Sequence, residues 1–198
     1  MIFEKPNYHL TIDDGPSKNF VELVNWLDSK NIKATFFSLG HLIKIRMRDV
    51  TWAIERGHCV ANHSYSHPDF SGLNYLQGQA EIIATQSLLD KAYKDAGVES
   101  KRIFRFPSGR REKKTIQFLE KEGFYNPWKH LVKGVDVKWT FDLQDWRLNR
   151  EDVLDEILDK AKLISKKEHV ILAHDRHKGD LVPFQKLCES IGIVEMGD

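Results

Sequence analysis

The sequence predicts an α/β fold in which a mostly parallel sheet is wound into a barrel. Short apolar runs alternate with longer stretches of helical periodicity along all 198 residues, an alternation typical of βαβ units. About seven strand-plus-helix units can be traced, which suits a barrel better than a small open sheet. Because a complete eightfold barrel typically needs about 250 residues, we expect a barrel that is short-looped, irregular or missing a unit.

The first half of the chain alternates three predicted strands with three predicted helices. Apolar side chains at i, i+3, i+4 and i+7 from Phe20 to Leu27 indicate an amphipathic helix. Gly40 ends the second strand, and Gly57 and Gly97 end the later helices. The predicted strands are residues 8–12, 34–39 and 59–62, and the helices after the first are residues 42–56 and 73–96.

The second half continues the alternation with shorter apolar runs. The run over residues 103–106 stops at Pro107, which cannot donate a hydrogen bond to a ladder. The remaining predicted strands are residues 124–126, 139–141, 170–173 and 191–196, and the predicted helices are residues 112–122, 153–164 and 181–190. Because no repeat, low-complexity tract or linker is present, we expect residues 1–198 to form a single domain.

The composition is that of an ordinary globular chain. Hydrophobic residues make up 41% and charged residues 30%, which excludes wholesale disorder. The 30 basic and 29 acidic residues give a net charge of +1, so we expect neither nucleic acid nor a membrane surface as a partner. No apolar run approaches the roughly 20 residues needed to span a bilayer. We also expect the protein to be a monomer.

The number of cysteines and the residues at the N-terminus indicate in which cellular compartment the protein is found. Cys59 and Cys188 are too few for a disulfide framework or a thiolate zinc site, and two buried thiols are the simpler interpretation. The first residues lack a basic stretch followed by an apolar one, as a signal peptide would have. We expect a cytoplasmic protein, the alternative being a trimmed secreted or periplasmic one.

Titratable side chains follow five of the predicted strands. The carboxyl ends of parallel strands share one face of an α/β fold, and functional groups gather there. We therefore expect these residues to meet at one rim. They are Asp13, Asp14, His63, Arg105, Asp142, His174 and Asp175.

Two histidines and a carboxylate suggest a metal site. His63 and His67 are four residues apart and lie on one face if the turn is helical. Neutral imidazoles suit zinc and similar ions, and the adjacent Asp13 and Asp14 offer a carboxylate ligand together with a free base. The plainer interpretation is a surface histidine pair and a solvated turn.

Three further residues are ambiguous when taken singly. Arg105 would commonly be a surface ion-pair partner. The segment Asp142-Leu-Gln-Asp145-Trp146 could begin a helix with an acidic first turn, and His174 could be a satisfied core histidine.

Taken in order, the segments resemble the polysaccharide deacetylase family, also called carbohydrate esterase family four or the NodB-homology domain. Its five motifs span residues 11–174, and five motifs in sequence are highly specific. Residues 34–37 and 57–62 also look like the family. The motifs are Thr11-Ile-Asp-Asp-Gly-Pro16, His63-Ser-Tyr-Ser-His67, Arg105-Phe-Pro-Ser-Gly109, Asp142-Leu-Gln-Asp-Trp146 and Leu172-Ala-His174.

The resemblance implies a distorted (β/α) barrel of seven or eight mostly parallel strands. It implies a divalent metal, usually Zn²⁺ with Co²⁺, Ni²⁺ or Mn²⁺ as alternatives. By position, the metal ligands are Asp14, His63 and His67. The catalytic group comprises Asp13 as base, His174 as acid, Arg105 orienting the base and Asp142 tuning the acid. The substrate and oxyanion positions are Ser108, Pro107, Trp146 and Leu172.

The implied activity is removal of N-acetyl groups from N-acetylglucosamine-containing glycans, either chitin-type oligosaccharides or peptidoglycan. Ser108 departs from the family, which usually has an aromatic residue there, so the sugar or acyl group accepted could differ. O-acetylated xylan or a small N-acyl compound are alternative substrates. Two rival classes are a non-haem iron oxygenase, which shares the two-histidine, one-carboxylate set, and a glycan-binding relative without turnover.

Overall fold

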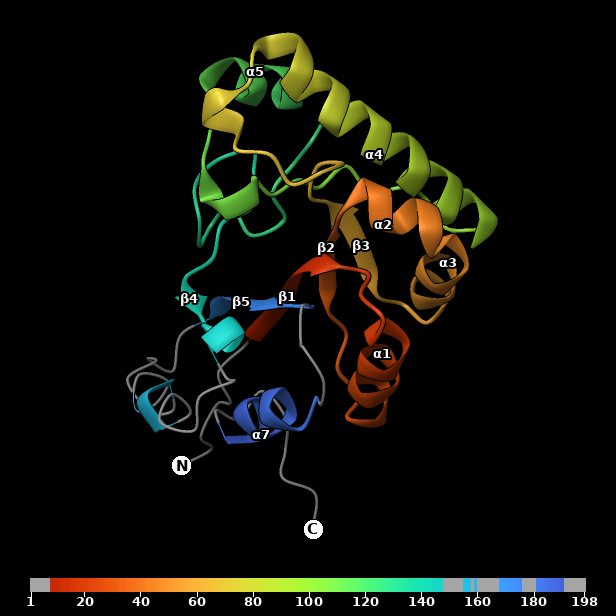
Figure 1. Ribbon diagram of the computed structural model, residues 1–198, viewed down its shortest axis with the longest axis vertical. Helices are drawn as coiled ribbons and strands as arrows, with labels where there is room; N and C mark the ends of the chain where they lie inside the picture. Colours follow the sequence, from red (N-terminus) through yellow and green to blue (C-terminus); the bar gives the residue numbers. More distant parts are fainter. Residues whose placement is uncertain (1–7, 148–154, 158, 160–167, 176–180, 191–198) are drawn as a thin grey trace.

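The computed structural model describes residues 8–147, 155–157, 159, 168–175 and 181–190 (Figure 1). Within these ranges five parallel strands form one sheet in the order β3-β2-β1-β5-β4. The strands are β1 (Tyr8–Gly15), β2 (Thr35–Ser38), β3 (Cys59–Asn62), β4 (Phe141–Asp142) and β5 (His169–His174). Because β1 pairs with β5, the first and the last of these strands along the chain lie side by side in the sheet. The predicted α/β class with parallel strands is confirmed.

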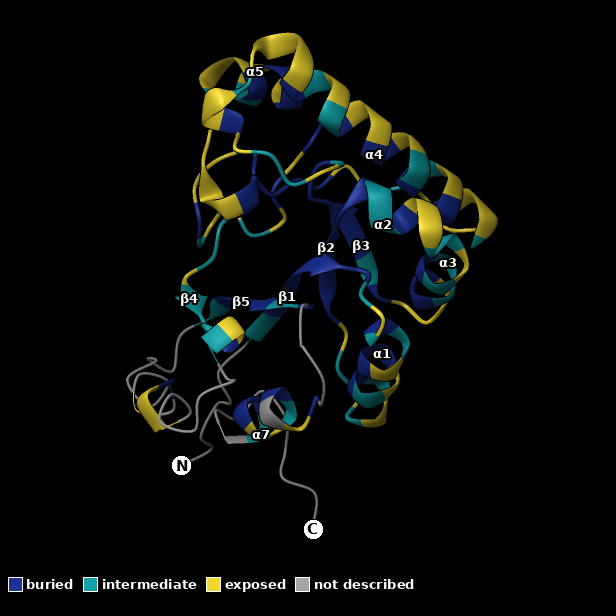
Figure 2. Ribbon diagram, in the orientation of Figure 1, coloured by how far each residue is buried: buried dark blue, intermediate teal, exposed yellow. Residues whose placement is uncertain are grey.

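Helices surround the strands, and the strands are the most buried part of the molecule (Figures 1 and 2). The predicted stripe of the first helix is confirmed, because all four of its apolar side chains have no exposed area. The helices are α1 (Phe20–Ser29), α2 (Gly40–Ile45), α3 (Met47–Glu55), α4 (Tyr75–Asp95), α5 (Lys113–Lys121) and α7 (Val182–Ser190). Three short 3₁₀ turns are η1 (Phe70–Gly72), η2 (Pro107–Gly109) and η3 (Asp145–Arg147).

The helix predicted over residues 42–56 is two helices, α2 and α3. The helical backbone breaks at Arg46, whose φ and ψ are −114° and 33°. The Arg46 guanidinium binds Asp49 in the first turn of α3 at 2.9 Å. Both helices pack against α4, and the break lets each follow it separately. Apolar periodicity alone does not reveal such a break, since it passes through Arg46 without interruption.

Between β3 and β4 the predicted strands are reduced to isolated contacts. Phe104 forms one parallel bridge with Asn62, and its carbonyl accepts a hydrogen bond from Val137 N at 2.8 Å. Further along, Thr140 N donates to Val170 O of β5 at 2.9 Å. Pro107 has no N–H, so the run before it cannot extend the ladder. Over the described residues the sheet therefore does not close into a barrel of seven or eight strands.

Other predicted elements differ at their edges or lie outside the described residues. Residues 124–126 form no strand, although Tyr125 N donates to Arg102 O at 2.9 Å. The strand predicted at 139–141 is observed as β4, shifted by two residues at its start. The terminal strand 191–196 and most of the helix 153–164 lie outside the described residues.

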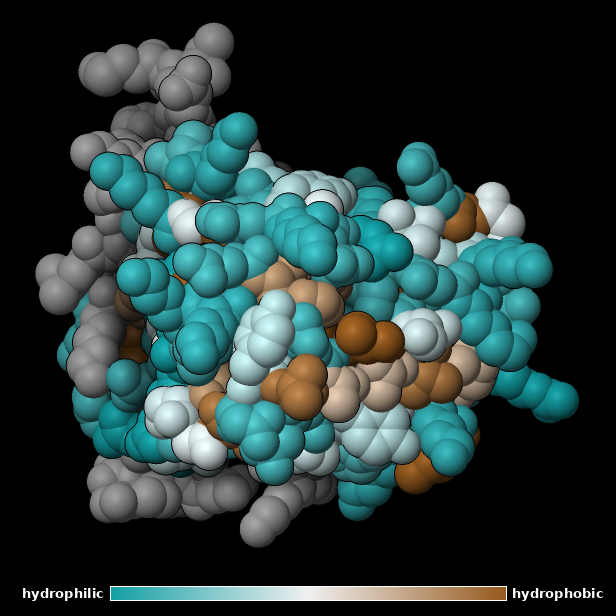
Figure 3. Space-filling model, turned by 90° about the horizontal axis from the view of Figure 1, so that it is seen from above, coloured by the Kyte–Doolittle hydropathy of each residue, from teal (hydrophilic) through white to brown (hydrophobic). Residues whose placement is uncertain are grey.

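The longest helix, α4, closes one end of the molecule together with α5 (Figure 1). Its outer face includes the exposed apolar side chains Leu76 and Ile83. Figure 3, which looks onto this end, shows apolar side chains scattered among hydrophilic ones, as on most protein surfaces. No helix among the described residues combines the length and apolar character needed to cross a bilayer.

Candidate functional site

Strand β1 presents two consecutive carboxylates to the same place, although successive side chains of a regular strand point to opposite faces. The register with β2 shifts between Asp13 and Gly15, and Asp14 has a φ of 73°. This bulge turns Asp14 toward the side that Asp13 already faces. Asp13 Oδ2 and Asp14 Oδ1 consequently each lie 3.6 Å from Nε2 of His63.

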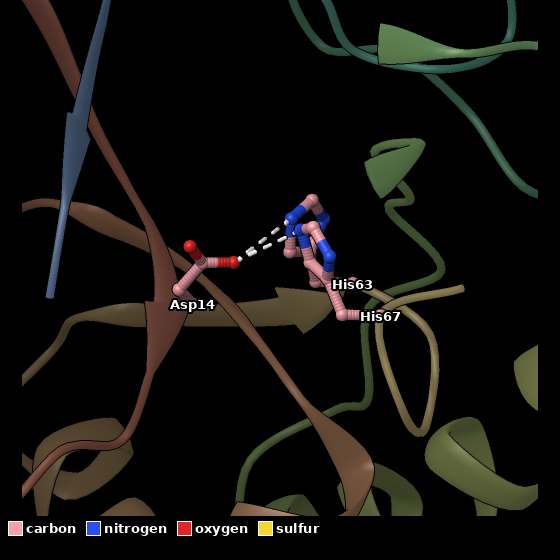
Figure 4. Close-up of side chains that lie close together, drawn as sticks. All are labelled: Asp14, His63 and His67. Carbon is pink, nitrogen blue, oxygen red and sulfur yellow. Dashed lines mark ion pairs between the residues drawn. The ribbon is translucent and has the colours of Figure 1, made fainter. Parts of the chain in front are cut away.

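The three predicted metal ligands converge. Asp14 Oδ1 is 3.2 Å from Nε2 of His67 as well as 3.6 Å from that of His63 (Figure 4). One ligand atom from each of the three residues lies within 4.8 Å of the others. Two of the residues are buried and His67 is half-buried, so the cluster opens toward solvent on one side. Two imidazoles and a carboxylate are a common donor set for a divalent metal.

The ring of His63 is oriented as a metal ligand requires. Its Nδ1 lies 2.9 Å from the carbonyl oxygen of Arg105, so Nδ1 carries the hydrogen and donates it. Nε2 therefore presents its lone pair to the carboxylates. Burial lowers the pKa of His63 to about 3, although Asp14 opposes the shift. The imidazole is neutral at physiological pH, which is the form that binds a metal.

A carboxylate on α4 holds the loop that carries both histidines. Glu81 Oε2 accepts hydrogen bonds from the backbone N–H groups of Tyr65 and Ser66, each at 2.8 Å. Within the same loop Ser64 and His67 have positive φ values of 69° and 62°. Strained backbone of this kind clusters at functional sites. Sequence reasoning missed Glu81, because one acidic residue on a helix carries no signal of its partner.

The buried pair Arg105 and Asp13 lies beside the metal cluster. Arg105 Nη1 donates to Asp13 Oδ1 at 2.6 Å and to Thr11 Oγ1 at 2.8 Å. The guanidinium is 1% exposed and lies over the Phe37 ring at 4.1 Å. Burial raises the pKa of Asp13, while the charge and hydrogen bond of Arg105 lower it. Arg105 is thus a buried partner and not a surface one; it fixes the Asp13 carboxylate in place and opposes the rise in pKa that burial causes.

His174 lies next to Asp13, because the two residues are paired in register between β1 and β5. Its Nδ1 is 2.9 Å from Asp145 Oδ1, and its backbone N donates to Asp145 Oδ2 at 2.8 Å. Burial lowers the pKa of His174, but the hydrogen bond and charge of Asp145, together with Asp13 and Asp14, raise it to about 9 overall. His174 is therefore a charged imidazolium at neutral pH with Nε2 free to donate a proton.

The carboxylate bound to His174 is Asp145, which corrects the assignment of that role to Asp142. Asp142 Oδ1 instead accepts a hydrogen bond from the Gln144 backbone N at 2.8 Å, an Asx turn that ends β4. Asp142 lies near enough to His174 for their charges to interact. The motif contains both acidic residues three apart, so its spacing could not show which one reaches the imidazole.

The expected substrate positions lie in η2, η3 and β5. Ser108 is exposed in η2 with a φ of 54°, and the preceding Pro107 is buried. Trp146 in η3 is 63% exposed. Leu172 is buried in β5 between Thr11 of β1 and Asp142 of β4.

Asp175 fixes the turn after β1. Its two carboxylate oxygens accept hydrogen bonds from the backbone N and the hydroxyl of Ser17, both at 2.7 Å. Its backbone N donates to Asp13 O at 2.8 Å. A Cβ at Gly15 would lie 2.6 Å from Asp175 Oδ2, so only glycine fits there. Asp175 thereby holds the segment that carries Asp13 and Asp14.

Comparison with known proteins gives matches over most of the chain. The sequence profile described as polysaccharide deacetylase matches residues 2–127. A peptidoglycan-N-acetylglucosamine deacetylase of Bacillus cereus is 29% identical over 181 residues, which are 90% of this chain and 59% of that protein. A chitooligosaccharide deacetylase of Sinorhizobium fredii is 28% identical over 171 residues, or 86% of this chain and 72% of that protein.

A solved structure gives the same result at the level of the fold. The family 4 carbohydrate esterase from Streptomyces lividans in complex with acetate superposes with a TM-score of 0.74 at 29% identity. The alignment covers 94% of this chain and 88% of that one. The chain spans between half and three-fifths of the length of the first two curated relatives that it matches.

Proposed function

The chain belongs to the polysaccharide deacetylase family, and on this premise we propose that it is a metal-dependent hydrolase that removes N-acetyl groups from N-acetylglucosamine-containing glycans. One observation carries the proposal. The Asp14, His63 and His67 cluster lies beside a carboxylate held by Arg105 and an imidazolium held by Asp145. Amide hydrolysis needs a base, an acid and an electrophile at one place; Asp13 and His174 would be the base and the acid, and the Asp14 cluster would hold a metal ion as the electrophile.

Asp14, His63 and His67 would hold the divalent ion, for which we propose Zn²⁺. The fit rests on the neutral, oriented imidazole of His63 and on ligand atoms that already lie within 4.8 Å of one another. When bound, such an ion polarises the acetyl carbonyl and lowers the pKa of a bound water molecule toward about 7.

Asp13 is the proposed general base. Its Oδ1 is occupied by Arg105, while Oδ2 faces the side on which His63 Nε2 lies, 3.6 Å away. The guanidinium favours the carboxylate form, which a base requires, against the effect of burial. Asp13 would take a proton from the attacking water as the water oxygen bonds to the acetyl carbon.

His174 is the proposed general acid. With its Nδ1 bonded to Asp145, its Nε2–H can be given to the sugar nitrogen as the carbon–nitrogen bond breaks. The Ser108 backbone N–H would donate to the carbonyl oxygen as negative charge develops on it. The products are acetate and a free amino sugar.

The test is acetate release from a substrate panel by chelator-treated and zinc-restored protein. The panel contains N-acetylated chito-oligosaccharides, peptidoglycan strands, O-acetylated xylan and a small N-acyl amine. We expect zinc-dependent acetate release from the N-acetylated glycans. Release only from xylan or the small amide would replace the proposed substrate class. Oxygen consumption with iron, in the absence of acetate release, would refute the hydrolase itself.

A further inference from the structure

A groove lies beside the proposed catalytic centre. It has a volume of about 310 Å³ and is lined by Ser108, Gly109, Lys138 and Trp139. One wall of the groove is formed by Ser108 and Gly109 of η2, and the other by Lys138 and Trp139. Arg105 connects both walls to the proposed catalytic centre. η2 follows Arg105 directly along the chain, and the carbonyls of Val137 and Lys138 accept hydrogen bonds from the guanidinium at 3.2 and 3.4 Å. The same guanidinium binds Asp13, so the groove is next to the site where an acetylated sugar would lie.

Trp139 gives this groove an aromatic wall. Its ring packs on Gly109 so closely that a Cβ there would lie 3.1 Å from Trp139 Cη2. Gly109 has a φ of 66°, a conformation that favours glycine. The Arg105 guanidinium carbon lies 5.6 Å from the centroid of the indole ring. The indole of Trp139 thus contacts Gly109 and lies near the Arg105 guanidinium. It provides an aromatic ring in the groove, which the Ser108 side chain does not.

Lys138 gives the groove a positive charge. The neighbouring arginines are all paired, since Arg105 binds Asp13, Arg110 binds Asp69 and Arg111 binds Asp136. Among the residues that the structure describes, none forms an ion pair with Lys138. The aliphatic part of a lysine side chain can pack on an apolar wall while its ammonium group stays in the solvent, where it can bind an anion in the groove.

From these two walls we infer that the groove is a subsite for a carboxylate-bearing sugar. The apolar face of the sugar ring stacks on Trp139, and its carboxylate pairs with the Lys138 ammonium. The inference rests on the proposed function for the neighbouring acetylated sugar. It narrows the substrate to an acidic glycan in which a sugar with a free carboxylate follows N-acetylglucosamine, as in peptidoglycan strands without stem peptides, rather than a neutral chitin chain.

The test compares two tetrasaccharides of equal length. One is neutral chitotetraose, and the other is a peptide-free peptidoglycan fragment in which every second sugar carries a lactyl carboxylate. Dissociation constants are measured by calorimetry on the zinc-loaded Asp13→Asn protein, in which turnover is blocked. We expect the acidic tetrasaccharide to bind about threefold more tightly, the size typical of an exposed ion pair. The preference should shrink as salt is raised.

Variants separate the two walls. Lys138→Gln should abolish the preference and leave chitotetraose binding unchanged, whereas Lys94→Gln, an exposed lysine at the far end of α4, should change neither. Trp139→Leu should weaken both ligands about tenfold, and Trp139→Phe should restore most of the loss because it keeps an aromatic face. Thermal unfolding of each variant checks that the fold is retained.

The two proposals fail in different ways. Equal affinity for the two tetrasaccharides, no binding of either, or a preference that survives Lys138→Gln would overturn the subsite, whatever the wild-type protein releases. A preference that disappears with Lys138→Gln supports the subsite. If the wild-type protein then releases no acetate from either tetrasaccharide, the proposed deacetylation is what fails.

Discussion

Two clusters of the molecule contain the same three groups, two imidazoles and a carboxylate, at opposite ends of β1. At the carboxyl end, Asp14, His63 and His67 gather around one carboxylate oxygen. At the other end, His9 and His130 bind Glu168. The first lies at the carboxyl ends of β1 and β3, and the second joins the starts of β1 and β5 to the loop that contains His130.

The clusters differ in how the carboxylate is used. Each carboxylate oxygen of Glu168 contacts a different imidazole, at 2.5 Å from His9 and 2.9 Å from His130. Asp14 instead turns a single oxygen to both imidazoles at 3.2 and 3.6 Å, distances that leave room for an ion between them. The His130 side chain is 56% exposed, whereas that of His63 is 1% exposed.

Two histidines and a carboxylate therefore do not form a metal site merely because they lie close together; one ligand atom of each must face a common point. Among the described residues, only the Asp14 cluster brings three ligand atoms within 4.8 Å of one another. The bulge in β1 positions Asp14, the Arg105 carbonyl orients His63, and Glu81 holds the loop that carries both histidines. The Glu168 cluster, by contrast, is a set of contacts among partly exposed side chains. The following experiments test this contrast, beginning with the largest expected effect.

Removing one imidazole from each cluster tests the contrast directly. We expect His67→Ala to lose zinc and to lower acetate release by more than about a hundredfold, because loss of a residue that merely orients a ligand already costs 10–100-fold. His130→Ala is the matched control and should retain both. Zinc content after dialysis and acetate release are the measurements. Equal losses in the two variants would abolish the distinction between the clusters.

Asp13→Asn separates the base from the metal ligands. We expect a rate about 10²–10⁴-fold lower, the usual contribution of general base catalysis, with zinc still bound. The variant leaves the Arg105 charge buried without its partner, so unfolding should also require about 3–5 kcal/mol less. Zinc content and urea unfolding accompany the rate measurement. Metal-dependent activity near that of the wild type would refute the role of Asp13.

Asp145→Asn tests the partner of the acid through pH. The pKa of His174 is raised to about 9, so the charged acid is present below this pH and activity should fall as pH rises through it. Without the Asp145 charge, the basic limb of the bell-shaped rate profile should move to lower pH. Asp142→Asn should move it less, because Asp142 makes no hydrogen bond to the imidazole. A larger shift in Asp142→Asn would restore the assignment made from sequence.

Glu168→Gln probes the surface cluster and should have the smallest effect. The two histidines lower the pKa of Glu168, chiefly through their hydrogen bonds. The stability from this pair is therefore present above the ordinary carboxyl pKa and is lost as pH falls below it. We expect a slightly lower Tm at pH 7, a smaller difference as the pH falls below the ordinary carboxyl pKa, and unchanged acetate release. A loss of activity would show that the cluster supports the site across the sheet.

Most of the site was predictable because the family motifs occupy the ends of strands. Asp13, Asp14, His63, Arg105 and His174 were expected at one rim because each lies at the end of an apolar run, and His67 was singled out by its four-residue spacing from His63. The roles within the fourth motif were not predictable. Asp142 and Asp145 are equivalent by residue type, and only the Asx turn that occupies Asp142 directs Asp145 to the imidazole.

The sequence by itself determined the alternation of strands and helices, the buried stripe of α1 and the gathering of titratable groups at one edge. These features follow from local periodicity and from the rule that parallel strands end on the same side. The tertiary structure decided the bulge at Asp14, the hold of Glu81 on the histidine loop and the packing of Trp139 on Gly109. Each of these joins segments distant in sequence or bends the backbone by packing, and neither effect leaves a periodic trace in the chain.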